Sequence, residues 1–194
     1  MFDLPLLSLL IWLPIAGGLT VLICGKRTYA ARWLALFFSL LTMLLSFGLY
    51  IGFDSSTASM QFSENRLWVA AFNIHYALGV DGFSMPLMIL TTISTMLVVI
   101  ASWQSIQDRI AQYLAAFLIM EGLMLGVFAA LDAILFYLFF EAMLIPLFLV
   151  IGIWGGGESG LCNPEVFLVY LFWFCFFTDR FAVSAISGRQ FCHS

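Results

Sequence analysis

The apolar positions of this 194-residue chain are gathered into long continuous runs. Three runs, at 4–24, 33–53 and 82–103, contain no Asp, Glu, Lys or Arg, and each is long enough to cross a bilayer as a helix. Two more runs, at 113–131 and 133–154, have the same length and apolarity, but each holds one acid. The pattern predicts an all-α, polytopic bundle of five membrane-spanning helices, with the fifth packed against the fourth.

The composition agrees with a membrane protein and excludes an ordinary soluble domain. Hydrophobic residues make up 63% of the chain, charged residues make up 9%, and the mean hydropathy is +1.08. The net charge of −4 is small and scattered along the chain, which does not suggest a nucleic-acid partner. The lipid bilayer is therefore the first partner that the sequence predicts.

The few cations predict the orientation of the helices. Lys26, Arg27 and Arg32 lie between the first and second runs, and Arg109 lies between the third and fourth. Loops rich in Lys and Arg face the cytoplasm, so the N-terminus and the long connection 54–81 are expected outside. The chain begins MFDLPLL, without the basic start and cleavage site of a secretory signal, so the first helix is expected to remain in the mature protein.

Metal and cofactor chemistry has no sequence signature here. The cysteines form no CxxC motif, and the histidines have no acid or cysteine at ligand spacing. There is also no GxGxxG, Walker loop or nucleophile elbow. We expect neither a metal site nor a nucleotide or flavin cofactor on this chain.

The two acids inside the apolar runs, Glu121 and Glu141, are the candidate functional residues. An acid at the centre of a membrane helix costs roughly 2.5–3.5 kcal/mol and usually turns toward the bundle interior. Desolvation favours the neutral acid and a nearby cation favours the carboxylate, so an acid held between the two can load and release a proton. The alternative is a protonated acid that only hydrogen-bonds a neighbouring helix, and this interpretation suits Glu121 better than Glu141. Pro146 distinguishes Glu141, because its missing N–H frees a backbone carbonyl one turn earlier.

Several stretches also resemble a known family. The segment FYLFFEAMLIPLFLVIGIWGG at 136–156 is similar to the fifth helix of the M-subunit family of bacterial NADH-quinone oxidoreductase, respiratory complex I, whose mitochondrial counterpart is chain 4. The resemblance covers about residues 1–157. It continues through LLSLLIWLPIAGG, YALGVDGFSMPL and YLAAFLIMEGLMLGVFAALDAILFYLFFE.

This resemblance implies the N-terminal fragment of an antiporter-like, proton-translocating membrane-arm subunit that couples electron transfer from NADH to quinone to proton transport. In that family Glu141 matches a proton-loading glutamate coupled to a lysine on a later, broken helix. Glu121 and Pro146 remain possible secondary residues on the physical grounds given above, not on the resemblance. Asp132 matches an acid with no role that we assign. The resemblance places NADH, FMN, iron–sulfur clusters and quinone on other subunits, names the L and N subunits as partners, and implies the bacterial inner membrane.

The segment 158–194 departs from the family. Its apolar stretch is short for a span, and three of the four cysteines lie in it. Synonymous codons can be chosen for 160–182 so that reading one nucleotide later gives AYATLKFFLYTFFGSVFLLIA, which resembles the sixth helix of the family. We therefore expect an out-of-frame tail after about residue 157. The chain has one lysine, Lys26, so the partner lysine of Glu141 is absent, and the chain alone is expected to be inactive.

Three other functions remain open on the sequence. An Mrp-type cation/proton antiporter subunit would share the buried acids. A multidrug or cation transporter would need a cavity built from repeated halves, which five spans do not supply. A structural membrane subunit without a proton path would tolerate replacement of Glu141 with full turnover.

Overall fold

The computed structural model describes residues 5–25, 28–54, 57, 59–69, 74–106 and 109–154. The chain divides into two units, Met1–Leu149 and Val150–Ser194, and the helix bundle belongs to the first. In the second, the described residues are the end of a helix at Val150–Trp154, so the predicted tail at 158–194 lies outside the described residues.

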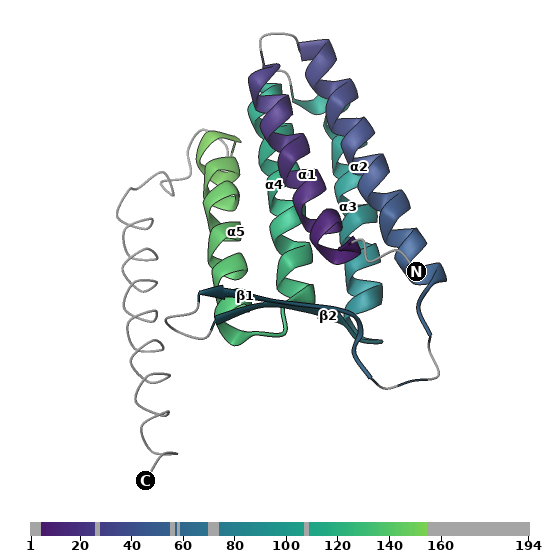
Figure 1. The fold of residues 1–194 in the computed structure, drawn as a ribbon. Helices are drawn as coiled ribbons and strands as arrows, with labels where there is room; N and C mark the ends of the chain where they lie inside the picture. Colours follow the sequence, from purple (N-terminus) through teal and green to yellow (C-terminus); the bar gives the residue numbers. More distant parts are fainter. Residues whose placement is uncertain are drawn as a thin grey trace. The chain divides into compact units, whose positions relative to one another are not determined.

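Five helices account for the five predicted spans (Figure 1). The apolar runs predicted their bounds to within five residues, because a long apolar run satisfies its backbone groups in lipid only as a helix. The largest difference is the start of α2, where the helix continues beyond its apolar run and includes Arg32. The helices are α1 Leu6–Ile23, α2 Thr28–Ile51, α3 Ser84–Ser105, α4 Ile110–Ala129 and α5 Ala133–Trp154.

Helices α1 and α4 form the most extensive helix pair, although they are far apart in sequence. Gly122 on α4 permits the close approach, since a Cβ built there would lie 2.6 Å from the backbone oxygen of Ile11. Small residues at such crossings let membrane helices pack backbone to backbone. Helices α2 and α3 complete this part of the bundle, as Figure 1 shows.

Helix α5 contacts α4 near the turn that joins them. Phe139 packs against Gly126, and Leu135 joins the same buried cluster as Leu125 and Ala129. Further along α5 the side chain of Ile145 is 64% exposed. The predicted packing of the fifth span on the fourth therefore holds for the first turns of α5 and not for its whole length.

The connection between α2 and α3 contains an antiparallel β-hairpin, which the sequence analysis treated as a loop. Its strands are β1 Gln61–Val69 and β2 Ile74–Val80, with Arg66 paired to Tyr76 and Glu64 paired to Leu78. Two register irregularities interrupt the ladder. The hairpin lies across one end of the helices (Figure 1). The all-α description thus holds for the spans, with a small sheet added outside them.

Asp81 caps the start of α3. The Ser84 amide donates to Asp81 Oδ1 at 2.7 Å, and the Asp81 amide lies 3.1 Å from Ser84 Oγ, to which it donates. The Met85 amide donates to the Asp81 carbonyl at 3.2 Å, the first bond of the helix. This reciprocal pair follows the capping-box pattern. The hydrogen bonds from the Ser84 backbone and side chain hold the pKa of Asp81 below its ordinary value.

We predict that Asp81→Ala lowers the free energy of unfolding by about 1 kcal/mol at neutral pH, the usual cost of losing an N-cap. Because the folded-state pKa is lowered, the charge-dependent part of this contribution is present above the unfolded-state pKa, about 3.9, and is lost as the pH falls through the folded-state value. Unfolding in detergent micelles at pH 7 and below pH 4 measures both effects. Asp81→Asn is the matched control, since it keeps a capping oxygen but has no titrating charge. If this variant lost as much unfolding free energy at low pH as the native chain does, the pH dependence would not come from Asp81.

Candidate functional site

Glu121 lies in the middle of α4 with its side chain almost completely buried, at 1% exposed. Its neighbour Gly122 is the residue that packs against the α1 backbone, so the α1–α4 contact excludes water from the acid. Both carboxyl oxygens are buried, and neither has a hydrogen-bond partner within the described part of the chain. The hydrogen bond to a neighbouring helix that a purely structural acid would make is therefore missing here.

Glu141 lies in α5 and is half-buried. Its Oε2 is buried and lacks a hydrogen-bond partner among the residues described. Pro146 follows one turn later, is buried, and is accommodated inside a continuous helix. Since proline has no N–H, the carbonyl of Ala142 cannot receive its usual bond from position 146. Glu141 is thus next along α5 to the Ala142 carbonyl, which lacks its usual hydrogen-bond donor in the helix.

The two acids occupy the same depth on adjacent antiparallel helices. Glu121 is eight residues before the end of α4 and Glu141 is eight residues after the start of α5. At 1.5 Å per residue, each lies about 12 Å from its end of the α4–α5 turn. The helices touch between the turn and this depth, through Phe139 on Gly126. Both acids therefore lie within the apolar region, as the sequence predicted.

No countercharge reaches either acid within residues 5–25, 28–54, 59–69, 74–106 and 109–154. The cations there are Arg32 and Arg109, close to the starts of α2 and α4, and Arg66 in the hairpin. The guanidinium of Arg32 lies 5.9 Å from the ring centroid of Trp103, a cation–π contact away from both acids. The same residues contain no group of three or more His, Cys, Asp or Glu that could hold a metal ion.

Sequence reasoning missed the role of Glu64, which lies in the connection 54–81 and was not a candidate residue. Its carboxylate, on β1, caps the start of α1: Oε1 accepts from the Leu7 amide at 2.9 Å and the Ser8 amide at 3.4 Å, and Oε2 accepts from the Ser8 hydroxyl. An anion at a helix N-terminus satisfies unpaired N–H groups and interacts favourably with the helix dipole. The partner lies 57 positions away, so no local pattern predicts it.

Asp132 caps the start of α5 in a similar way. Its Oδ1 accepts from the Ile134 amide at 3.0 Å, and its carbonyl accepts from Phe136 at 2.9 Å. Its Oδ2 accepts from the His75 amide of β2 at 3.4 Å, and the Leu131 amide donates to the Ala77 carbonyl at 2.9 Å. The hairpin is therefore bonded to the starts of both α1 and α5.

Comparison with known proteins finds relatives of this chain among curated sequences. No family model matches the sequence. The chain is 44% identical over 168 residues to NADH-quinone oxidoreductase subunit M of Rhodobacter capsulatus, an alignment that covers 84% of this chain and 32% of that protein. It is 41% identical over 150 residues to NADH-ubiquinone oxidoreductase chain 4 of Chondrus crispus, covering 77% of this chain and 30% of that one.

A solved structure shares the fold as well. Respiratory complex I from Thermus thermophilus with bound NADH contains a chain that matches with a TM-score of 0.66 and 29% identity, over 79% of this chain and 30% of that one. The present chain spans about a third of the length of the curated relatives that it matches. The sequences and the fold agree in showing that this multi-pass membrane chain belongs to the family of NADH-quinone oxidoreductase subunit M and NADH-ubiquinone oxidoreductase chain 4.

Proposed function

We propose that the chain is the N-terminal part of a proton-translocating membrane-arm subunit of NADH-quinone oxidoreductase, with Glu141 as a proton-loading group. The observation that carries this proposal is that Glu141 lies inside a membrane span and its buried Oε2 has no hydrogen-bond partner among the described residues. The relatives are oxidoreductase subunits, which does not favour an Mrp-type antiporter.

The chemistry proposed for Glu141 is reversible binding of one proton at its carboxyl group. Among the described residues of these five helices, no cation lies beside the Glu141 carboxyl group. In the M-subunit family, which this chain resembles, a lysine on a later helix would favour the ionised carboxylate. Approach and withdrawal of that cation would release and reload the proton. Glu121 and Pro146 are secondary residues in this scheme, at the same depth and one turn away.

The proposed setting is complex I itself. Other membrane-arm subunits, especially the antiporter-like L and N subunits, are the proposed partners, and NADH, FMN, iron–sulfur clusters and quinone are proposed to bind elsewhere in the complex. We place the chain in the bacterial inner membrane. The enzymatic activity would belong to the complex, with no redox chemistry on this chain.

Orientation gives a separate prediction. Four of the five cations in the first 154 residues lie in the two connections that would face the cytoplasm or, for Arg32, in the adjoining start of α2, so the N-terminus and the hairpin would lie outside. A cysteine placed at Arg109 should react with a membrane-impermeant thiol reagent only in inverted vesicles, and one placed at Asn65 only in right-side-out vesicles. The four native cysteines, Cys24, Cys162, Cys175 and Cys192, are replaced by Ser in both chains. Labelling of the position-109 cysteine from the outside would contradict this orientation.

The proposed function is tested in membranes whose complex I carries this chain continued to the length of its relatives. NADH-driven quinone reduction and proton uptake are measured together, with membranes that lack the subunit as the reference. Restoration of both activities supports the proposal. Assembled complex that reduces quinone without moving additional protons would favour a structural subunit instead.

A further inference from the structure

Two apolar clusters fill the bundle formed by α1 to α4, one beside the hairpin and one toward the other end of the helices. Both contain buried residues from α2, α3 and α4. In the hairpin cluster these residues are Leu49, Met85, Met88, Leu125 and Ala129. In the distal cluster they include Ala35, Val99, Leu114 and Leu118. The same three helices therefore face one another at both levels.

Between the two clusters, the facing sides of these helices are polar. Positions three and four apart share a helix face, and the polar residues continue the spacing of the cluster residues. On α4, for example, Glu121 is three positions after Leu118 and four positions before Leu125. We call these residues the polar layer, and none of them is more than 8% exposed. The polar layer consists of Ser39, Thr42, Ser46, Thr92, Thr95 and Glu121.

The middle of the polar layer lies at one depth. Thr42 is nine residues before the end of α2, Thr92 is eight residues after the start of α3, and Glu121 is eight residues before the end of α4. At 1.5 Å per residue, each lies about 12–14 Å from the hairpin end of its helix. All three pairs among α2, α3 and α4 pack together. The acid is therefore on the same level as hydroxyl groups of two neighbouring helices.

The threonine hydroxyls use their protons within their own helices. The Thr42 hydroxyl donates to the carbonyl four positions earlier at 2.6 Å, and the Thr92 hydroxyl donates to the carbonyl three positions earlier at 2.9 Å. Ser39 and Thr95 make the same kind of bond. Each hydroxyl oxygen keeps lone pairs that can accept a further hydrogen bond. The polar layer is thus rich in acceptors.

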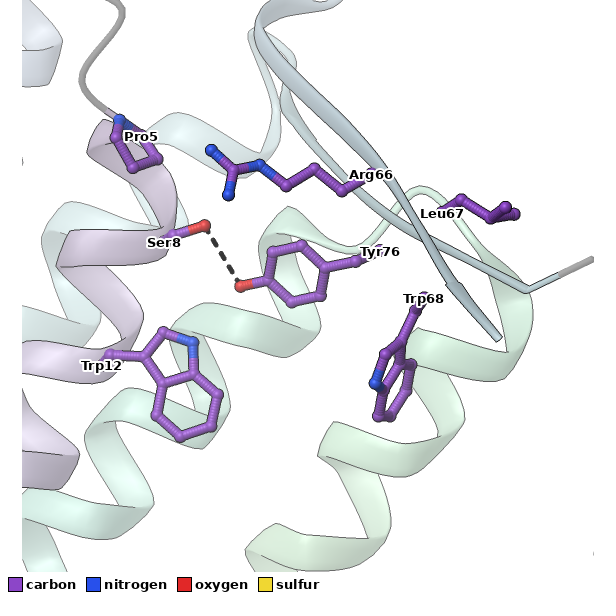
Figure 2. A pocket seen from close by; sticks show the side chains of 7 residues that line it. All are labelled: Pro5, Ser8, Trp12, Arg66, Leu67, Trp68 and Tyr76. Atoms are coloured by element: carbon purple, nitrogen blue, oxygen red, sulfur yellow. Dashed lines mark hydrogen bonds between the residues drawn. The ribbon is translucent and has the colours of Figure 1, made fainter. Parts of the chain in front are cut away.

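Three buried oxygens in the polar layer have no hydrogen-bond partner among the residues that the structure describes. They are Oε1 and Oε2 of Glu121 and Oγ of Ser46. A hydroxyl at the start of α1 is satisfied differently, since Ser8 shares a hydrogen bond of 3.3 Å with Tyr76 on the hairpin (Figure 2). Buried polar groups without a protein partner are commonly satisfied by bound water. The α1–α4 contact keeps solvent from Glu121, so such a molecule would be held inside the bundle.

We propose that the polar layer binds internal water, which hydrates the carboxyl group of Glu121. The two protons of a water molecule suit acceptors such as the Thr42 and Thr92 hydroxyl oxygens. Its oxygen would accept from the Ser46 hydroxyl and from the carboxyl group of Glu121 in its neutral form. A monovalent cation would satisfy the acceptors but would leave the Ser46 proton without one. Serine and threonine are also smaller than leucine and methionine, which leaves space for a molecule of this size.

The test is infrared spectroscopy of the 194-residue chain in nanodiscs, recorded as native-minus-variant difference spectra. Glu121→Leu removes the carboxyl group, so the native chain should show an O–H stretching band of bound water that this variant lacks. That band should shift when the hydrating water carries heavy oxygen, whereas bands of side-chain hydroxyls should not. The C=O stretch of the Glu121 carboxyl, identified by its loss in Glu121→Leu, should shift in deuterium oxide as the acid exchanges its proton with the bound water.

Thr92→Val isolates the contribution of one hydroxyl, because valine has nearly the size of threonine and lacks the oxygen. In this variant the water band should be lost and the Glu121 C=O stretch should move to higher frequency. Thr92→Ser, which keeps the hydroxyl, should resemble the native chain. Thr20→Val is the matched control, since Thr20 is exposed on α1 and its hydroxyl also donates to a carbonyl of its own helix, at 2.7 Å. It should change neither band.

Absence of a heavy-oxygen-sensitive band that depends on Glu121 would overturn the proposal. An unchanged water band in Thr92→Val, at native helicity by circular dichroism, would overturn it as well. Sodium chloride in place of choline chloride separates water from a cation, because loss of the Glu121 C=O stretch on adding sodium would identify a bound cation instead. The proposal does not rest on the role of Glu141, and no readout uses quinone reduction or proton uptake.

Discussion

Glu141→Gln is expected to reduce proton uptake coupled to NADH oxidation by about tenfold or more, in complex I that carries this chain continued to the length of its relatives. The substitution keeps the size and shape of the side chain and removes its ionisable proton. A positioned acid–base group typically contributes a factor of about 10²–10⁴ to a proton-transfer step, so its removal should dominate the rate. Because the buried Oε2 of Glu141 has no hydrogen-bond partner among the described residues, the amide should break no hydrogen bond there and the complex should assemble normally.

Glu141→Asp provides the matched comparison, since it retains an ionisable group that is one methylene shorter. It should keep a measurable part of the proton uptake, while Glu141→Gln should not. The amount of assembled complex in each membrane is measured beside NADH-driven quinone reduction and proton uptake. Native rates in Glu141→Gln at equal assembly would show that the acid is only a buried polar group and would refute its proposed role.

Gly122→Ala is expected to destabilise the helix bundle by about 1–3 kcal/mol, the usual cost of forcing extra atoms into a packed interface. The new methyl group would lie 2.6 Å from the Ile11 carbonyl oxygen and 2.6 Å from Cγ1 of Ile15. Backbone cannot swing aside as a flexible side chain can, so α1 must move away from α4. The largest helix interface of the fold would then open beside Glu121.

Gly48→Ala is the control for this prediction, because Gly48 is also inside a membrane helix but a Cβ there would meet nothing within 4 Å. That change should leave stability unchanged or raise it by about 0.5–1 kcal/mol, since alanine favours a helix over glycine. Unfolding of each variant in mixed detergent micelles gives the difference. Equal midpoints for Gly122→Ala and the native chain would show that the α1–α4 contact is not as close as described.

The five helices could be predicted from the sequence because a membrane span depends on one local property, a sufficiently long apolar run. The bounds of α5 were predicted without error, since Ala133 follows Asp132 at once and the apolar run ends at Trp154. The start of α2 was predicted five residues too late, because the helix continues past the run and includes Arg32, whose guanidinium rests over Trp103. Apolarity marks the span, whereas the helix can continue beyond it.

The hairpin could not be predicted in the same way. Its strand β1 places Glu64 and Arg66 where a simple alternating pattern would require apolar residues, and register irregularities interrupt the pairing. Glu64 serves the start of a helix that lies 57 positions away in the chain. Glu121 and Glu141 were identifiable because a single acid in an apolar run is conspicuous, but their lack of partners is a property of the packed helices.

The cap that Glu64 places on α1 also sets an order of events during synthesis. The 57 positions between Leu7 and Glu64 take roughly 3–11 s to translate at about 5–20 residues per second. The first helix therefore enters the membrane with its leading amides open, and its principal neighbour α4 begins only at Ile110. For that interval α1 depends on water and headgroups at its exposed end. Formation of the hairpin is the step at which the leading amides of α1 can first receive the Glu64 carboxylate.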